Sequence, residues 1–407
     1  MKDAILVLNA GSSSIKFSLF HGFDAPQPRV ALKGQIEGIG VRPRFSARDA
    51  DGRALAGRSW EGGGARERED LLAYLLQWIA GQVEGDDLLA VGHRVVHGGA
   101  RHAEPALVTA EVLDDLRFQV PFFPLHLPAN LAPIETIARI DPHLPQAACF
   151  DSSFHRTIPE LAQRYGLPRA LHDQGLRGYG FHGLSYEYIA RVMADIDPGA
   201  ARGRTVVAHL GSGASLCALV GGKSVACTLG FSGLDGLLMG TRAGRLDPAI
   251  LLYLIQEKGM DAQALEDLLY RKSGLLGVSG VSSDMRDLLA SDSPHAREAV
   301  DLFVYCIVRE LGAMTAAAGG MDALVFTAGI GEHAPPIRAA VCSALTWLGL
   351  RLDGEANKRN ETLVSAPDSA VPVYVIPTNE ELMIARHTRG LVPGRAQGTG
   401  SINGGQK

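Results

Sequence analysis

Short apolar runs and longer amphipathic stretches alternate along this chain. Residues 299–318 carry apolar side chains at every third or fourth position, a spacing that predicts a helix with one buried face. Five apolar runs have the length of strands: 5–8, 88–97, 147–150, 324–327 and 371–376. This alternation predicts α/β domains whose sheets are covered by helices.

Turn and capping signals refine the outline. Residues 28–60 form short alternating runs, and Asp51-Gly52 between two of them is a hairpin turn sequence. Three further helices are expected to begin after the glycines at 62–64, at Asp247-Pro248 and after Pro377-Thr378-Asn379.

One local pattern occurs twice. Residues 5–17 and 206–216 each consist of an apolar run, a polar residue, a turn of Gly and Ser, and a second apolar run. Backbone N–H groups in such turns can form an anion-binding concavity, and Lys16 lies beside the first turn. A flexible linker is the alternative, but the apolar runs on both sides argue against it. Two matched turns therefore indicate a duplicated core that binds a phosphate chain.

Composition narrows the class of protein. The 407 residues are too many for one ordinary core, so two domains are expected. A net charge of −5 and an aromatic content of 6% give no case for a nucleic-acid or membrane partner. No apolar run is long enough for a membrane span, and the N-terminus has no signal-peptide layout. Five scattered cysteines without a C-x-x-C pair suit a reducing compartment, so a cytoplasmic protein is expected.

Two arginines stand in places where an anion could be bound. Arg94 interrupts an apolar strand, and Arg242 is embedded in the glycine-rich stretch 233–244. A guanidinium in either place could receive a carboxylate or a phosphate, or could form a structural salt bridge or lie on a surface loop. His93 and His97 are four residues apart, but on a strand and without the adjacent Glu of a zinc protease motif, so we do not predict a metal there.

Three further polar positions follow strands or flank glycines. His182 lies between Phe181 and Gly183, where it could contact a ligand or pack in a loop. Asp151 directly follows a strand and could hold Mg²⁺ or cap a turn. Glu380 and the neighbouring glutamate open the last helix, where a capping box from Thr378 to Glu381 is the structural alternative.

Two glycine motifs fail the nucleotide patterns that they resemble. Residues 329–332 read Gly-Ile-Gly-Glu and are expected to form a turn before a helix, but Ala334 and Pro335 do not complete a dinucleotide motif. Gly222-Lys223-Ser224 matches the end of a P-loop, but Cys217 stands where the required glycine would be.

These residues, taken in order, resemble the acetate kinase family, within the superfamily of acetate and sugar kinases, heat-shock chaperones and actin. The resemblance runs from about residue 4 to 387. It rests on ten separated motifs: 9–16, 93–99, 124–126, 150–155, 180–183, 209–211, 239–242, 279–286, 327–332 and 377–382.

The resemblance implies an α/β fold with two domains. Each domain would hold a duplicated actin-like, ribonuclease H-like core, and a nucleotide and substrate cleft would lie between them. The first domain would comprise 1–151 plus 382–394, and the second 152–381, with nucleotide binding and dimer contacts in the second. Residues 395–407 would form a disordered tail.

The resemblance also implies an activity: reversible Mg²⁺-dependent transfer of the ATP γ-phosphate to acetate, giving acetyl phosphate and ADP, by a homodimer. Mn²⁺ would substitute for Mg²⁺. The implied catalytic residues are Asn9, Arg94, His126, Asp151, His182 and Arg242. The implied acyl pocket is Arg94, Val96, Leu125, Phe181 and Gly233. The implied nucleotide contacts are Ser12, Ser14, Lys16, His209, Leu210, Gly211, Ser212, Gly213, Asp284, Met285, Arg286, Gly329, Ile330 and Gly331. The implied metal ligands are Asn9 and Glu380, with Asp151 as a further candidate.

The chain departs from the family pattern at seven positions: Leu127, Leu184, Tyr186, Ser212, Gly233, Arg245 and His333. Gly233 replaces a proline that walls the acyl pocket, so propionate or a longer acid is expected to be accepted. A propionate- or butyrate-preferring kinase, a sugar kinase and a non-catalytic ATP-binding module remain alternatives. A carboxylate acceptor is already ionised near neutral pH and needs no general base, whereas a sugar hydroxyl would.

Overall fold

The structure is a computed structural model that describes residues 3–11, 14–23, 25, 28–60, 68–83, 88–99 and 101–392. Ser12, the glycines at 62–64 and the predicted tail lie outside the described residues. The chain divides into two compact units. The first contains residues 1–95, 105–149 and 384–407, and the second contains 96–104 and 150–383.

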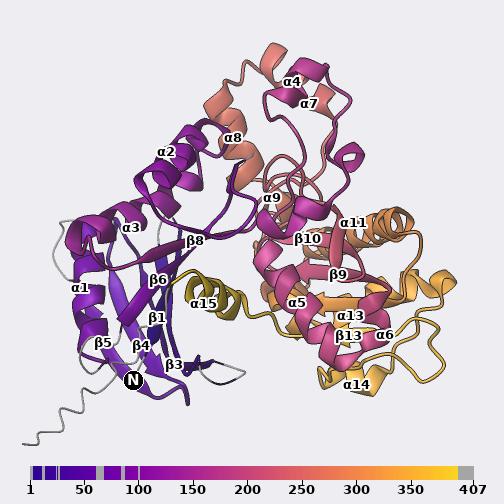
Figure 1. Cartoon of the computed structure of the whole chain (residues 1–407). Coiled ribbons are helices and arrows are strands. Elements are labelled where there is room, and N and C mark those ends of the chain that lie inside the picture. Colours follow the sequence, from indigo (N-terminus) through magenta and orange to yellow (C-terminus); the bar gives the residue numbers. More distant parts are fainter. Residues whose placement is uncertain are drawn as a thin grey trace, which may run out of the picture. The chain divides into compact units, whose positions relative to one another are not determined.

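The first unit is built on a sheet of eight described strands, drawn in indigo to purple in Figure 1. In spatial order these are β5 (Ala54–Ser59), β4 (Arg44–Asp49), β3 (Arg29–Glu37), β2 (Ser14–His21), β1 (Ala4–Ala10), β6 (Leu88–Val95), β8 (Gln146–Phe150) and β7 (Ala106–Leu107). Strands β1 to β5 pair antiparallel, and β6 pairs parallel to β1.

The second unit contains a sheet of five described strands. Their order is β11 (Lys223–Cys227), β10 (Ala214–Val220), β9 (Arg204–Leu210), β12 (Ala323–Thr327) and β13 (Val373–Val375). An antiparallel hairpin, β9–β10, again stands next to two parallel strands. The order β11-β10-β9-β12-β13 thus repeats β3-β2-β1-β6-β8, which confirms the duplicated α/β core predicted from the two Gly/Ser turns.

Helices connect and cover the strands. The first unit has α1 (Arg68–Ala80), α2 (Ala110–Phe118), the short 3₁₀ turn Val120–Phe122 and α3 (Leu127–Ile140). The second has the 3₁₀ turns Ser153–Thr157, Glu160–Gln163 and Thr346–Leu348, and the helices α4 (Arg169–Asp173), α5 (Gly183–Ile196), α6 (Pro198–Arg202), α7 (Pro248–Gln256), α8 (Ala262–Arg271), α9 (Gly274–Ser279), α10 (Met285–Ala290), α11 (Pro294–Ala318), α12 (Ala328–His333), α13 (Pro335–Ala344) and α14 (Gly354–Lys358). Helix α15 (Glu380–Leu391) begins in the second unit and continues into the first.

The core of the first unit combines aromatic stacking with a close helix–sheet contact. The rings of Phe17 and Phe45 stack at 5.7 Å, and Trp78 of α1 packs edge-on against both. On β6, a Cβ at Gly92 would lie 2.7 Å from the side chain of Ile384. Only glycine therefore lets α15 lie directly on this strand.

The second sheet is covered on both faces. Tyr186, Ile189 and Met193 of α5 pack with Val207 and Val325 on one face. Side chains alternate along a strand, so the neighbouring buried residues of β9 and β12 face the other side, where α11 packs across β9, β10 and β11. The helix predicted over 299–318 is confirmed as part of α11.

One local prediction is wrong, and one structural alternative does not form. The stretch 329–332 belongs to the helix α12, which begins at Ala328 with a positive φ of 64°. The Thr378–Glu381 capping box does not form, because Asn379 Oδ1 accepts the N–H of Leu382 at 3.0 Å and Thr378 Oγ1 bonds instead to Ser185 Oγ at 2.8 Å. The Asp247 cap is confirmed, since its carboxylate accepts the N–H of Ala249 at 2.9 Å. In the described residues no helix is both long and apolar enough to cross a lipid bilayer.

Candidate active site

Arg242 and His182 converge on the second Gly/Ser turn, between β9 and β10. A Cβ at Gly213 would lie 2.6 Å from Arg242 Nη2 and 3.3 Å from His182 Nε2. Arg242 Nη1 also donates to the carbonyl of Gly233 at 2.5 Å. A cation and an imidazole therefore meet over Gly213, which carries no side chain, and this suits close approach of an anion.

The backbone of His182 is unusual. Its φ of 57° places it in the left-handed region, at the residue before α5. The next N–H, that of Gly183, donates to the backbone carbonyl of Asp151 at 2.9 Å. A strained non-glycine residue at a helix start is typical of a functional position, and here it brings His182 beside the end of β8.

A chain of hydrogen bonds supports His182 from behind. Its Nδ1 lies 2.8 Å from Ser215 Oγ, and Ser215 Oγ lies 2.5 Å from the hydroxyl of Tyr186. Burial raises the pKa of Tyr186 well above its usual value, with further contributions from Cys227 and Cys217, so the phenol keeps its proton. Ser215 could not be singled out beforehand, because a serine in a buried strand carries no motif.

A second chain of hydrogen bonds holds His209. Its ring stacks on that of His182, with 4.2 Å between the centroids, and its Nδ1 lies 2.9 Å from Ser185 Oγ. Ser185 Oγ accepts from Thr378 Oγ1, whose backbone N–H donates to Glu332 Oε1 at 3.1 Å. Residues from four separate motifs are thereby fixed around one pair of imidazoles.

The two carboxylates expected near the metal belong to this same unit. Asp151 is only 1% exposed at the end of β8. Glu380, the first residue of α15, is half-buried and contributes to the raised pKa of Tyr186. Mg²⁺ is usually held by one or two carboxylates together with phosphate oxygens, so this donor set fits it without a larger protein cluster.

Part of the predicted acyl wall also lies in the second unit. Phe181 is 3% exposed, and its ring lies 5.9 Å from that of His97, next to Val96. A Cβ at Gly233 would lie 2.9 Å from Arg242 Nη1. Because Gly233 has no side chain, it leaves room in the predicted acyl wall and lets the Arg242 guanidinium lie directly beside it.

A cavity of about 420 Å³ gathers residues predicted to contact the nucleotide. It is lined by Gly211, Ser212, Ser283, Asp284, Met285, Arg286, Leu289, Gly329, Ile330, His333 and Ala334. The N–H of Gly240, two residues before Arg242, donates to the carbonyl of Ser212 at 3.1 Å. The cavity and the Arg242 loop thus meet at the second Gly/Ser turn. Gly331, His209, Leu210 and Gly213 are not among its lining residues.

Asp284 and Arg286 have a structural role as well. Two hydrogen bonds of 3.0 and 2.6 Å join the guanidinium to the carboxylate, which also accepts the N–H of Arg286. These bonds to Arg286 lower the pKa of Asp284 to about 2. The pair forms one edge of the cavity and leaves the face of the guanidinium exposed.

In the first unit, several of the other predicted site residues lie on or beside the β1–β2 hairpin. Asn9 pairs across the hairpin with Lys16, and its Oδ1 accepts from Arg94 Nη1 at 3.5 Å. Ser14 begins β2 and closes the turn, since its carbonyl accepts the N–H of Gly11 at 2.8 Å. Arg94 is half-buried beside the polar end of β1.

His126 is the residue before α3, and the same hairpin anchors that helix. One turn further along α3, Asn130 Nδ2 donates to the carbonyl of Ala10 at 2.8 Å. Leu127 is fully buried, which accounts for an apolar residue there, and Leu125 is half-buried. Asn130 is a supporting residue that the sequence analysis missed.

Two histidines are buried here: His93 in β6 and His97 just after the end of that strand. His93 Nε2 lies 2.8 Å from Gln146 Oε1, and burial lowers the pKa of His93 to about 4. Burial, assisted by Arg156 and Arg177, lowers the pKa of His97 to about 3. Both imidazoles are therefore neutral, and among the described residues no group of three or more His, Cys, Asp or Glu side chains could hold a metal.

Comparisons with known proteins agree with this arrangement. A sequence profile described as the Acetokinase family matches residues 4–386. An acetate kinase of Rhodopseudomonas palustris is 53% identical over 398 residues, covering 97% of this chain and 100% of that protein. A propionate kinase structure from Francisella tularensis superposes with a TM-score of 0.90 at 35% identity, covering 96% of this chain and 100% of that one. An acetate kinase structure from Porphyromonas gingivalis gives 0.86 at 34% identity, covering 96% and 99%.

Proposed function

The chain belongs to the Acetokinase family, and from this premise we propose that it transfers the γ-phosphoryl group of ATP reversibly to acetate, giving acetyl phosphate and ADP. The observation that carries the proposal is the convergence of Arg242 and His182 on Gly213. A nucleotide switch that transfers nothing would not need both groups at the end of the nucleotide cavity.

The reaction needs positioning and charge stabilisation more than proton transfer. Acetate is ionised near neutral pH, so one of its oxygens can attack the γ-phosphorus directly while the bond to the β–γ bridging oxygen breaks. Arg242 would stabilise the negative charge spread over the transferring group, and His182 would donate a hydrogen bond to it. Asp151 would orient the reacting end.

The hydrogen-bond chain behind His182 determines which ring nitrogen carries the proton. Within the described part of the chain, Ser215 Oγ is the hydrogen-bond partner of the buried Tyr186 hydroxyl, so this hydroxyl is best satisfied by donating to it. Ser215 then donates to His182 Nδ1, which leaves the proton on Nε2, the nitrogen near Gly213. Tyr186 and Ser215 would thus be positioning residues that hold His182 as a neutral donor.

The nucleotide and the metal would lie beside these groups. Adenosine would occupy the cavity at Asp284 and Gly329, with the phosphates toward Ser212 and Gly213. Mg²⁺, or Mn²⁺ in its place, would be held by Glu380 and Asp151 and would neutralise charge on the phosphate oxygens when bound. Asn9, Ser12, Ser14, Lys16, Arg94 and His126 would complete the site from the first domain, with Asn9 as a further metal ligand and Leu125 in the acyl wall.

The domain assignment also remains our proposal. Residues 1–151 plus 382–394 would form one actin-like domain and 152–381 the other, with the substrates bound between them. A cytoplasmic location is supported by five cysteines that are all free.

Trapping of the product with hydroxylamine separates this proposal from its rivals. Enzyme, ATP, Mg²⁺ and acetate are expected to give acetyl hydroxamate, because hydroxylamine captures the acyl phosphate as it forms. ATP hydrolysis with no hydroxamate from any short acid would indicate an ATP-binding module instead. Phosphorylation of a sugar in a parallel assay would favour the sugar kinase.

Gly233 leads us to expect broad acid specificity. Propionate should be used with kcat/KM within about 200-fold of acetate, because one methylene changes discrimination by only ~1–3 kcal/mol, or about 10–200-fold. Gly233→Pro should lower the propionate-to-acetate ratio of kcat/KM by narrowing the pocket. We use the ratio of the two kcat/KM values because any displacement of Arg242 by the proline ring would lower the activity with both acids.

The matched control is Gly354→Ala, at a glycine whose added Cβ would meet nothing within 4 Å. It should leave the ratio unchanged. A strong preference for acetate that Gly233→Pro does not alter would contradict the assignment of Gly233 to the acyl wall.

A homodimer is supported by the composition of α7. This helix reads Pro-Ala-Ile-Leu-Leu-Tyr-Leu-Ile-Gln and has no buried residue in the described structure. Leu252 is 56% exposed and Tyr253 50%. A nine-residue helix is marginal without tertiary packing, so a second copy of the chain covering this face would stabilise it.

Leu252→Asp is expected to convert the dimer to a monomer, because it places a charge at the centre of the apolar face. Light scattering after size-exclusion chromatography measures the mass, and Glu257→Gln at the end of α7 is the control. A wild-type protein that elutes as a monomer at micromolar concentration would rule the dimer out.

A further inference from the structure

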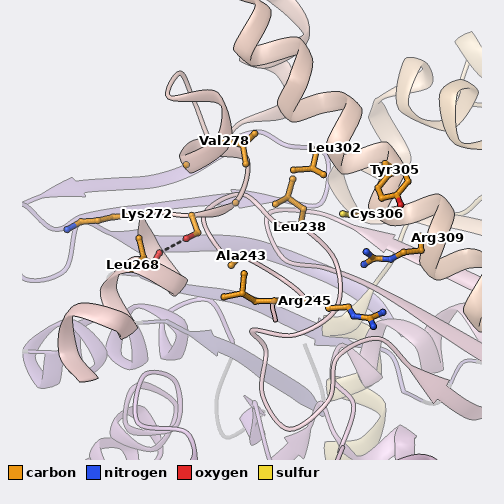
Figure 2. Close-up of a pocket in the computed structure, with 15 residues that line it drawn as sticks. Leu238, Ala243, Arg245, Leu268, Lys272, Val278, Leu302, Tyr305, Cys306 and Arg309 are labelled. Atoms are coloured by element: carbon orange, nitrogen blue, oxygen red, sulfur yellow. Dashed lines mark hydrogen bonds between the residues drawn. The ribbon is translucent and has the colours of Figure 1, made fainter. Parts of the chain in front are cut away.

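A second and larger cavity lies in the second unit, beside the loop that carries Arg242. Its volume is about 510 Å³, within the range of small-molecule sites. Figure 2 shows its interior formed by Leu238, Leu268, Val278 and Leu302, which come from the glycine-rich loop, α8, α9 and α11. None of the roles proposed above uses this cavity.

The cavity has an apolar interior and a cationic rim. Lys272 lies at one end, whereas the guanidinium groups of Arg245 and Arg309 approach each other at the other end in Figure 2. None of its lining residues is an Asp or a Glu. Carboxylates outside the cavity compensate part of this charge: Lys272 pairs with Asp267 at 2.5 Å, whereas the carboxylate of Glu310 serves both Arg245 at 3.7 Å and Arg309 at 3.0 Å. The excess of positive charge therefore lies at the arginine end.

The wall of the cavity is bonded to the backbone that carries Arg242. The N–H of Ala243, itself a lining residue, donates to the carbonyl of Leu269 at 3.1 Å, and the N–H of Ser273 donates to the carbonyl of Thr241. A Cβ at Gly274 would lie 2.9 Å from the backbone nitrogen of Arg242. A molecule that displaces this wall must therefore also displace Arg242.

We propose that this cavity binds an aliphatic carboxylate of medium chain length. The alkyl chain lies against Leu238, Val278 and Leu302, and the carboxylate lies between Arg245 and Arg309, where positive charge is in excess. Occupancy shifts the Arg242 loop and lowers the turnover of the enzyme. The effect on turnover rests on the proposed function, whereas the binding of the carboxylate in the cavity does not.

Titration calorimetry with sodium octanoate tests the binding. The wild-type protein should bind octanoate with a Kd of about 1 mM or lower. Leu302→Glu, which places a carboxylate at a partly exposed position of the wall, and Arg309→Gln, which removes the head-group contact, should each weaken binding at least tenfold. Arg297→Gln, an exposed residue of α11 outside the cavity, is the matched control. Octylammonium should not bind, because it carries the wrong charge.

The acyl pocket is the competing location. Octanoate binding should persist in Arg94→Ala and in the presence of saturating acetate. Binding that disappears in Arg94→Ala but survives in Leu302→Glu would overturn the proposal, and so would an absence of saturable heat in the wild-type protein.

The effect on turnover is measured separately. At saturating ATP and acetate, octanoate should lower kcat at least twofold in the wild-type enzyme and leave it unchanged in Leu302→Glu. Binding with unchanged kcat would overturn the link to Arg242. A protein that binds octanoate in this cavity yet forms no acyl phosphate would contradict the proposed function and leave the binding site standing.

Discussion

Replacing Arg242 by alanine is expected to lower kcat about a thousandfold or more, while the protein stays folded. An arginine that stabilises the charge of a transferring phosphoryl group contributes about 10³–10⁵ to kcat in other phosphotransferases. Arg242 Nη2 lies 2.6 Å from the position that a Cβ at Gly213 would take, and its Nη1 donates to the Gly233 carbonyl. Stopped hydroxamate assays with acetate, compared with thermal unfolding of the same samples, measure both quantities.

Arg242→Lys should recover little of this activity, because an ammonium group cannot reproduce the planar fork that reaches two acceptors. Arg351→Ala is the control, since Arg351 forms an exposed ion pair with Asp368 at 3.0 Å, far from the glycine-rich loop in sequence. If Arg242→Ala loses activity only through a raised KM for ATP, Arg242 acts in ground-state binding and the assigned role is incorrect.

Replacing His182 by alanine is expected to lower kcat about 10²–10³-fold, the usual cost of removing one preorganised hydrogen-bond donor. The KM for ATP should change little, because the nucleotide cavity does not include His182. Tyr186→Phe should have a smaller effect on kcat, since it removes only the group that orients Ser215.

The tautomer of His182 distinguishes this mechanism from simple packing. Nitrogen-15 spectra of the free wild-type protein should show the proton on Nε2, and Ser215→Ala should shift the population toward Nδ1–H. Full activity in His182→Ala, or a wild-type His182 protonated on Nδ1, would be incompatible with donation from Nε2. Because the spectra need no turnover, they test the positioning chain even in an inactive variant.

The sequence predicted the architecture because its signals are local and repeated. A strand, a turn of small residues and a second strand occupy a few consecutive positions, and the pattern occurs at β1–β2 and again at β9–β10. The helix over 299–318 and the cap at Asp247 are likewise set by residues within a few positions. Each of these predictions is confirmed.

The support of the candidate site could not be predicted in the same way. Ser215 and Tyr186 meet His182 only because β10 and α5 pack together, and no spacing in the sequence reports that contact. The capping box weighed as an alternative at Thr378 does not form for the same reason, since the Thr378 hydroxyl donates to Ser185, nearly two hundred residues away. Arg338 is a further example: it is fully buried and bonded to Asn357 and the carbonyl of Gly331, although nothing local marks it as a core residue.

The path of the chain through its two units has a consequence for synthesis on the ribosome. The first unit needs residues 384–391, which complete α15 over Gly92, yet residues 150–383 are translated before them. At about 5–20 residues per second, that stretch takes roughly 10 to 50 s to make. At the end of this interval the second unit has its full sequence, while β6 still lacks the helix that lies over Gly92. Nascent chains should therefore protect the later-made unit from protease first, reversing the usual order from the N-terminus.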